Sequence, residues 1–91
     1  MSAVNESTAL GMVKVRLNRL DTSLDAYLAA RITAAVEQLE GIGITLTDST
    51  DDLMLVTDLA VWQYQNRDSP GAMPDWLRLR RRERWLNNHA T

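Results

Sequence analysis

The sequence contains no cysteine and only one histidine, His89. Without cysteine the chain forms no disulfide and offers no thiolate ligand to a metal ion. The inward Glu and His pairs of a di-metal helical bundle are missing as well. No glycine-rich phosphate loop, nucleophile elbow or metal-binding helix motif is present. We therefore expect neither an enzyme nor a bound cofactor or metal, and we expect His89 to be a solvated tail residue.

Long hydrophobic runs are also missing. No apolar run approaches the roughly 20 residues that span a bilayer, so no membrane partner is expected. The opening segment, MSAVNESTALGMVK, has neither a basic start nor an apolar block, which argues against a signal peptide. The 91 residues are expected to form one soluble, intracellular domain over residues 1–91, with residues 1–6 frayed. A domain this small buries a modest share of its surface and gains stability from a partner.

Apolar spacing predicts two helices in the first half of the chain. The first covers residues 7–20 and can be capped by Ser7 or Thr8. The second covers residues 21–41 and is the clearest element, with Gly41 placed just past its end. Its apolar face recurs every three or four residues and consists of Leu24, Leu28, Ile32, Ala35 and Leu39.

A third helix is predicted over residues 48–67. Ser49 with Asp52 three residues later resembles a capping box with Asp in place of Glu. The helix is apolar over most of its girth, so we expect it to be central or to be covered by a second molecule. The preceding segment, IGITLTDST, is interpreted as a tucked loop, or as a short strand that pairs with another copy.

The fourth predicted helix covers residues 74–88. Pro70 and Gly71 indicate a turn, and Pro74 suits the first helical position because its missing N–H costs nothing there. The fold class is therefore all-α: a small bundle of about four helices, in which the long second and third helices form the core.

The fourth helix carries a narrow apolar seam surrounded by charge. The seam spans an arc of about 80° and consists of Trp76, Leu79 and Leu86. Glu83 lies on the same arc, Arg81 lies roughly opposite, and Leu77 and Trp85 leave it. We expect this helix to dock through the seam, with arginines on its flanks.

Charge is distributed unevenly along the chain. Residues 41–75 hold six acids and one base, whereas residues 76–91 hold five arginines and one acid. Three roles for the basic end remain open: solvated arginines on a packed helix, contact with an acidic protein surface, and phosphate contact with DNA. A sequence pI near 5.2 argues against a free-standing DNA-binding protein. The charge split predicts complementary contacts between copies, or two different partners.

Three ordered motifs resemble the phage head–tail connector (adaptor) proteins, over about residues 10–87. The first is MVKVRLNRLDTSLDAYLAARITAAVEQLEG, and the second is DDLMLVTDLAVWQYQNRD, which ends in an aromatic-x-Asn-Arg-acid signature. The third is AMPDWLRLRRRERWL, similar to a Met-Pro-x-x-Leu-Arg ending. The C-terminus is shorter and richer in Arg than is usual in the family.

The resemblance implies a structural virion protein of the neck, assembled in the host cytoplasm. It implies a homo-oligomeric ring of about twelve copies below the portal. Such a ring extends the DNA channel, without sequence-specific recognition, and receives a head-completion or tail-side neck protein. The alternative is a small DNA-binding regulatory or packaging accessory protein that uses the Arg-rich helix.

The resemblance also implies roles for individual residues. Those implied to contact the portal or a neighbouring subunit are Trp76, Leu77, Arg78, Arg80, Arg81, Arg82, Arg84 and Trp85. Tyr64, Asn66 and Arg67 are implied to fix the end of the third helix and the following loop. On this interpretation, Arg80 and Arg81 matter for assembly and are dispensable for folding.

Overall fold

Four helices make up the structure, a computed structural model that describes residues 3–68 and 71–89. They are α1 (Glu6–Arg16), α2 (Asp25–Gly41), α3 (Thr50–Gln65) and α4 (Asp75–His89). Within the described residues there is no strand, which confirms the predicted all-α class. None of the described helices is long and apolar enough to cross a membrane.

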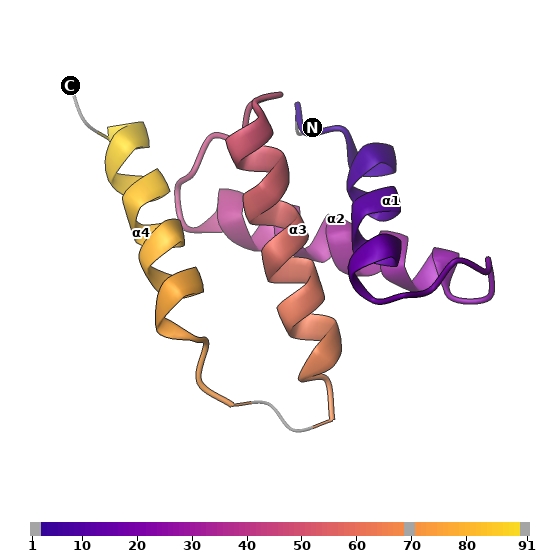
Figure 1. The fold of residues 1–91 in the computed structure, drawn as a ribbon. Coiled ribbons are helices and arrows are strands. Elements are labelled where there is room, and N and C mark those ends of the chain that lie inside the picture. Colours follow the sequence, from indigo (N-terminus) through magenta and orange to yellow (C-terminus); the bar gives the residue numbers. More distant parts are fainter. Residues whose placement is uncertain (1–2, 69–70, 90–91) are drawn as a thin grey trace.

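The central element is α3, as its apolar girth predicted. α1 and α2 pack against it and against each other, while α4 lies antiparallel to α3 on the side away from α1 (Figure 1). Residues 55–61 of α3 are all buried, because neighbours surround the helix on both sides. The predicted core face of α2 is confirmed, since Leu28, Ile32, Ala35 and Leu39 are all buried.

The start of α1 differs from the prediction. Its N-cap is Asn5, whose side-chain oxygen accepts a hydrogen bond from the Thr8 N–H at 3.0 Å. Val4 is buried in the core. Residues 4–6 are therefore ordered, which corrects the expected fraying over 1–6, and residues 1–2 lie outside the described part. Asn at an N-cap satisfies a free helix N–H, whereas Ser7 and Thr8 lie within the first turn.

The end of α1 also differs, because the helix stops at Arg16 and not near Leu20. Asn18 has φ 59°, a left-handed conformation that asparagine tolerates better than most residues. This residue turns the chain away from the helix axis. Leu20, the last residue of the predicted helix, is 79% exposed.

The segment between α2 and α3 is a tucked loop and not a short strand, in agreement with the first of the two interpretations. Ile44 and Leu46 are buried, and they anchor the loop to the core. Gly41 is the last residue of α2, so its predicted place beyond the helix is wrong. Gly43 takes the positive φ instead, at 102°.

Gly43→Ala is expected to lower the free energy of unfolding by about 1–2 kcal/mol, because a side chain at this φ is strained. A Cβ at this position would also lie 3.2 Å from Nε2 of His89 and 3.3 Å from Nε1 of Trp85. Gly41→Ala is the matched control, since a Cβ there meets nothing within 4 Å. Urea denaturation of both variants checks the prediction; equal stabilities would contradict it.

The chain enters α4 one residue later than predicted. The carbonyl of Pro74 accepts hydrogen bonds from the N–H groups of Leu77 and Arg78, at 3.2 and 3.0 Å. Pro74 therefore occupies the capping position that precedes the helix, and Asp75 is the first helical residue. Pro70, the other proline of the predicted turn, lies outside the described residues.

Candidate functional site

Within the chain, α4 packs on the core through the face opposite to its apolar seam. The residues turned toward α3 and the 42–47 loop recur at helical spacing and are buried or half-buried: Leu77, Arg80, Arg81, Arg84, Trp85 and Asn88. The predicted seam faces solvent instead. Trp76, Leu79 and Leu86 are 49%, 52% and 49% exposed. The helix therefore docks through arginines and a few apolar side chains, and it presents its apolar seam outward.

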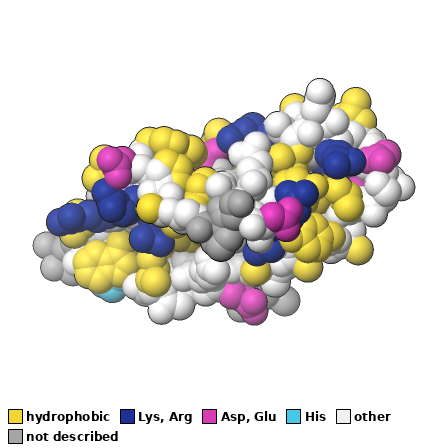
Figure 2. Space-filling view, turned by 90° about the horizontal axis from the view of Figure 1, so that it is seen from below, with side chains coloured by type: hydrophobic (Ala, Val, Ile, Leu, Met, Phe, Trp, Pro, Cys, Tyr) yellow, Lys and Arg dark blue, Asp and Glu magenta, His cyan; other side chains and the backbone are white. Residues whose placement is uncertain are grey.

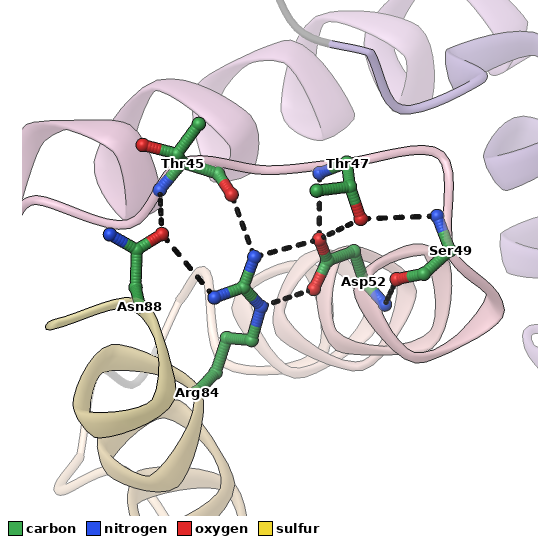
Figure 3. Close-up of polar contacts among 6 residues, drawn as sticks. All are labelled: Thr45, Thr47, Ser49, Asp52, Arg84 and Asn88. Carbon is green, nitrogen blue, oxygen red and sulfur yellow. Dashed lines mark hydrogen bonds and ion pairs between the residues drawn. The ribbon is translucent and has the colours of Figure 1, made fainter. Parts of the chain in front are cut away.

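The strongest contact between α4 and the core joins Arg84 to Asp52 (Figure 3). Nε of Arg84 donates to one carboxylate oxygen at 2.6 Å and Nη2 donates to the other at 3.1 Å. Nη2 also donates to the Thr45 carbonyl at 2.7 Å. Asp52 is only 1% exposed. The planar guanidinium suits this two-pronged contact, which fixes both the position and the rotation of α4.

Half of the predicted capping box at Ser49 is confirmed. The Ser49 hydroxyl oxygen accepts a hydrogen bond from the Asp52 N–H at 3.1 Å. The Asp52 carboxylate does not return to the Ser49 N–H, as a capping box requires. It accepts from the N–H and the hydroxyl of Thr47 instead, at 2.7 and 2.8 Å. Asp52 thus joins the loop, α3 and α4 at one carboxylate.

Ionisation of this pair follows from its surroundings. Burial raises the pKa of Asp52, but hydrogen bonds from Arg84 and Thr47, together with the positive charge of Arg84, outweigh it. The resulting pKa of Asp52 lies below its ordinary value of 3.8. The hydrogen bond to Asp52 raises the pKa of Arg84. Both groups are therefore charged at neutral pH.

Acid is expected to weaken the fold through Asp52. Because its pKa is lower in the folded state, its contribution is full above the unfolded value near 3.8 and is lost as the pH falls through the folded pKa. The stability difference between the natural chain and Asp52→Asn should therefore shrink below about pH 4. Urea denaturation between pH 7 and pH 2 measures it; a constant difference would contradict the lowered pKa.

A second buried carboxylate, Asp58, is held by two arginines. Arg16 of α1 donates to one oxygen at 2.6 Å, and Arg80 of α4 donates to the other. Asp58 lies within α3, so this contact ties the first and last helices to the central one. Two cations share one anion, which leaves one positive charge uncompensated at this point. Arg80 therefore has a structural contact that the sequence did not predict, while Arg16 would still pair with Asp58 in its absence.

The end of α4 closes over the loop through Trp85 and His89. Nε1 of Trp85 donates to the Ile42 carbonyl at 2.7 Å. The rings of Trp85 and His89 stack with centroids 4.0 Å apart, and Nε2 of His89 lies 3.0 Å from the Gly43 carbonyl oxygen. His89 is exposed, as expected of a residue near the end of the chain, but its ring also contacts Trp85 and the Gly43 carbonyl.

The eight residues implied as an interface divide into two groups. Four are used inside the chain: Leu77 is fully buried, while Arg80, Arg84 and Trp85 bind α3 or the loop. Of the other four, Trp76, Arg78 and Arg82 are exposed and Arg81 is half-buried. Arg78 pairs with the exposed Asp75 at 2.6 Å. Arg81 and Arg82 form no ion pair with any described residue.

The end of α3 is fixed by the three residues assigned to it. The Asn66 side chain donates to the Trp62 carbonyl at 2.8 Å. The Arg67 side chain donates to the Tyr64 carbonyl at 2.5 Å, and its guanidinium lies 4.0 Å from the centre of the Tyr64 ring. Both carbonyls also accept backbone N–H groups, from Asn66 at 3.1 Å and from Arg67 at 3.4 Å, so the side chains add a second donor to each. Tyr64 also meets the ring of Tyr27 edge-on, which links α3 to α2.

Asp52 and Asp58 are the site residues that sequence reasoning missed. Asp52 was assigned to the helix start and Asp58 was counted as part of an acidic region. For Asp58 the sequence does carry a clue, because the residue lies in the mainly apolar stretch LMLVTDLAVW. A carboxylate in such a helix becomes buried and needs a cation beside it.

Across residues 3–68 and 71–89, no three His, Cys, Asp or Glu side chains gather where they could hold a metal ion. Both buried carboxylates are neutralised by arginine. In comparisons with known protein families, curated proteins and solved structures, the chain matches none of them.

Proposed function

We propose that this chain is a structural connector protein of the phage neck, which assembles as a homo-oligomeric ring of about twelve copies between the portal and a tail-side protein. The observation that carries the proposal is the outward seam of α4. Trp76, Leu79 and Leu86 are about half-exposed along one helical face of a helix clamped to the core by two ion-pair sites. A row of half-exposed apolar side chains along one face of a firmly held helix supports a docking role for that face.

The surroundings of the seam fit a protein partner. Arg78 and Arg82 are exposed beside it, and Trp and Arg are the residue types enriched at interface hot spots. On the α4 side of the molecule, basic and hydrophobic side chains lie next to one another (left in Figure 2). The motifs that resemble the connector family include this helix.

The DNA-binding alternative is weakened by the same contacts. Of the five arginines in α4, Arg80 and Arg84 are paired with buried carboxylates, and Arg78 pairs with Asp75. Phosphate binding would depend on Arg81 and Arg82, a small basic surface for a chain of net charge −2. Titration with duplex DNA at several salt concentrations tests this alternative, because phosphate-driven binding weakens steeply as salt rises.

Electron microscopy of the assembled neck tests the connector proposal directly. We expect rings of this chain next to the portal, and we expect its gene to lie between capsid and tail genes. Absence of the chain from the purified particle would refute the proposal. DNA binding at low salt by a chain that is absent from the particle would favour the accessory role instead.

A further inference from the structure

Two tyrosine rings near the end of α3 each carry an arginine that lacks a close carboxylate. The rings of Tyr27 in α2 and Tyr64 in α3 meet edge-on, with their centroids 5.9 Å apart. The guanidinium of Arg31 lies 5.6 Å from the centre of the Tyr27 ring, and that of Arg67 lies 4.0 Å from the centre of the Tyr64 ring. Each ring therefore supports one cation through its negative face.

Neutral groups hold both guanidiniums in place. Nη2 of Arg31 donates to the Tyr27 hydroxyl at 2.9 Å, and Nη1 of Arg67 donates to the Tyr64 carbonyl at 2.5 Å. Arg31 forms no ion pair with a described residue, and Nε of Arg67 lies 4.0 Å from a carboxylate oxygen of the exposed Asp68. Neutral partners orient a cation without cancelling its charge, so both arginines keep N–H groups for an anion.

The same two arginines line a small hollow between α2 and the end of α3. It has a volume of about 220 Å³, and its described lining residues are Arg31, Trp62, Gln63, Asn66 and Arg67. Two cations, two side-chain amides and an indole ring thus surround it, and no described carboxylate does. Two like charges beside one hollow raise its positive potential, which attracts an anion.

A second hollow shares Arg67 with the first. It has a volume of about 460 Å³, and its described lining residues are Arg19, Ser23, Leu24, Tyr27, Tyr64 and Arg67. Arg19 is exposed and forms no ion pair with the part of the chain that the structure describes. Figure 2 looks onto the end of the molecule where α3 stops, and right of its centre basic side chains lie among hydrophobic ones. The two hollows together therefore offer three arginines beside aromatic and apolar groups.

The amount of charge selects the class of ligand. The planar arginine fork suits carboxylate and phosphate groups alike. Proteins that bind a nucleic-acid backbone, however, neutralise many phosphates at once. Here the three arginines lie near two exposed carboxylates, Asp68 beside Arg67 and Asp21, which accepts a hydrogen bond from the Ser23 hydroxyl at 2.8 Å. The small positive excess, in a chain of net charge −2, suits one or two carboxylates better than a phosphate backbone.

We infer that the two hollows beside Arg67 form a docking site for an acidic peptide segment of a partner protein. One carboxylate of the segment binds between Arg31 and Arg67, and a second binds near Arg19. Trp62 and Leu24 supply apolar surface for the residues between them. No residue of the site belongs to α4, so this is a second contact surface, and it goes beyond the proposed function.

NMR titration of the isotope-labelled full-length chain tests the site, with a capped peptide of glutamates flanking one leucine as the probe. The chain has three tryptophans, so the indole N–H of Trp62 reports on the hollow and those of Trp76 and Trp85 report on α4. We expect the Trp62 indole signal and the side-chain signals of Arg31 and Arg67 to shift, while the α4 indole signals stay in place.

Substitutions measure the contribution of each charge. Arg31→Gln is expected to weaken peptide binding about tenfold, because it removes a charge-assisted hydrogen bond. Asp68→Asn is expected to strengthen binding, because it removes the competing carboxylate. Arg82→Gln is the matched control, since Arg82 is an exposed arginine of α4 without an ion pair to a described residue. Arg19→Gln provides a second weakening variant at an exposed position, and thermal melts establish that each variant is folded.

The titrations decide the inference in either direction. Shifts confined to the two hollows, with weaker binding by the Arg31 and Arg19 variants and unchanged binding by the Arg82 variant, support it. Equal weakening by Arg31→Gln and Arg82→Gln would show attraction by charge alone and overturn it. Absence of shifts at millimolar peptide would overturn it as well. A short DNA duplex that moves the same signals and displaces the peptide would assign the hollows to phosphate and overturn the choice of a protein partner.

Discussion

Arg84→Ala is expected to lower the free energy of unfolding by about 3–5 kcal/mol, because it leaves Asp52 as a buried charge without its cation. The carboxylate keeps the two hydrogen bonds from Thr47 but loses those from Arg84, and the Thr45 carbonyl loses a donor. A chain of 91 residues has a total stability of roughly 5–14 kcal/mol, so this loss is a large share of it. Urea denaturation followed by circular dichroism measures the change.

Arg82→Ala is the matched control, since Arg82 is exposed on the same helix and forms no ion pair with a described residue. Its effect should stay within about 0.5 kcal/mol. Arg84→Lys should recover only part of the loss, because an ammonium group cannot make the two-pronged contact. Equal stabilities for the Arg84 and Arg82 variants would show that the buried pair does not hold α4.

α2 and α3 follow closely from their apolar periodicity. Leu28, Ile32 and Leu39 recur on one side of α2, and burial of that side is the solution that removes them from water. The girth of α3 predicted its central place for the same reason. The helix ends were predicted less well, because single side chains determine where a helix begins and stops. Asn5 caps α1, and Asn18 ends it.

The orientation of α4 could not be obtained from periodicity. A hydrophobic pattern assigns arginine to solvent, so the Trp76–Leu79–Leu86 seam appeared to be the buried face. The buried partners are carboxylates, however, and Arg80 and Arg84 are drawn inward to neutralise Asp58 and Asp52. Pairing of this kind joins residues 22 and 32 positions apart, and no local pattern reveals it.

The inward position of Arg80 and Arg84 gives a different explanation for the uneven charge distribution along the chain. The acidic middle and the basic end were expected to attract each other between copies. In the structure, Asp52 and Asp58 attract Arg84 and Arg80 within one copy. Internal pairing holds α4 in place and leaves the apolar seam, with Arg78 and Arg82 beside it, on the outward side of the helix.

Leu59→Ala is the second large effect, with an expected loss of about 2–5 kcal/mol from lost apolar contact and the cavity that remains. Leu59 is 2% exposed at the middle of α3, where α1 and α2 pack. Thermal or urea unfolding of the variant measures the loss. A decrease below about 1 kcal/mol would place Leu59 near the surface.

Leu79→Ala is the matched control for Leu59→Ala. The substitution is identical, but Leu79 is 52% exposed on the outward side of α4, so its effect should be below about 0.5 kcal/mol. If α4 docked through its apolar seam, Leu79 would be buried and both variants would lose several kcal/mol. A large effect at Leu59 with a small one at Leu79 therefore tests the core and the orientation of α4 together. A Leu79 variant that is stable as a monomer but defective in assembly would place that side chain at a contact between molecules.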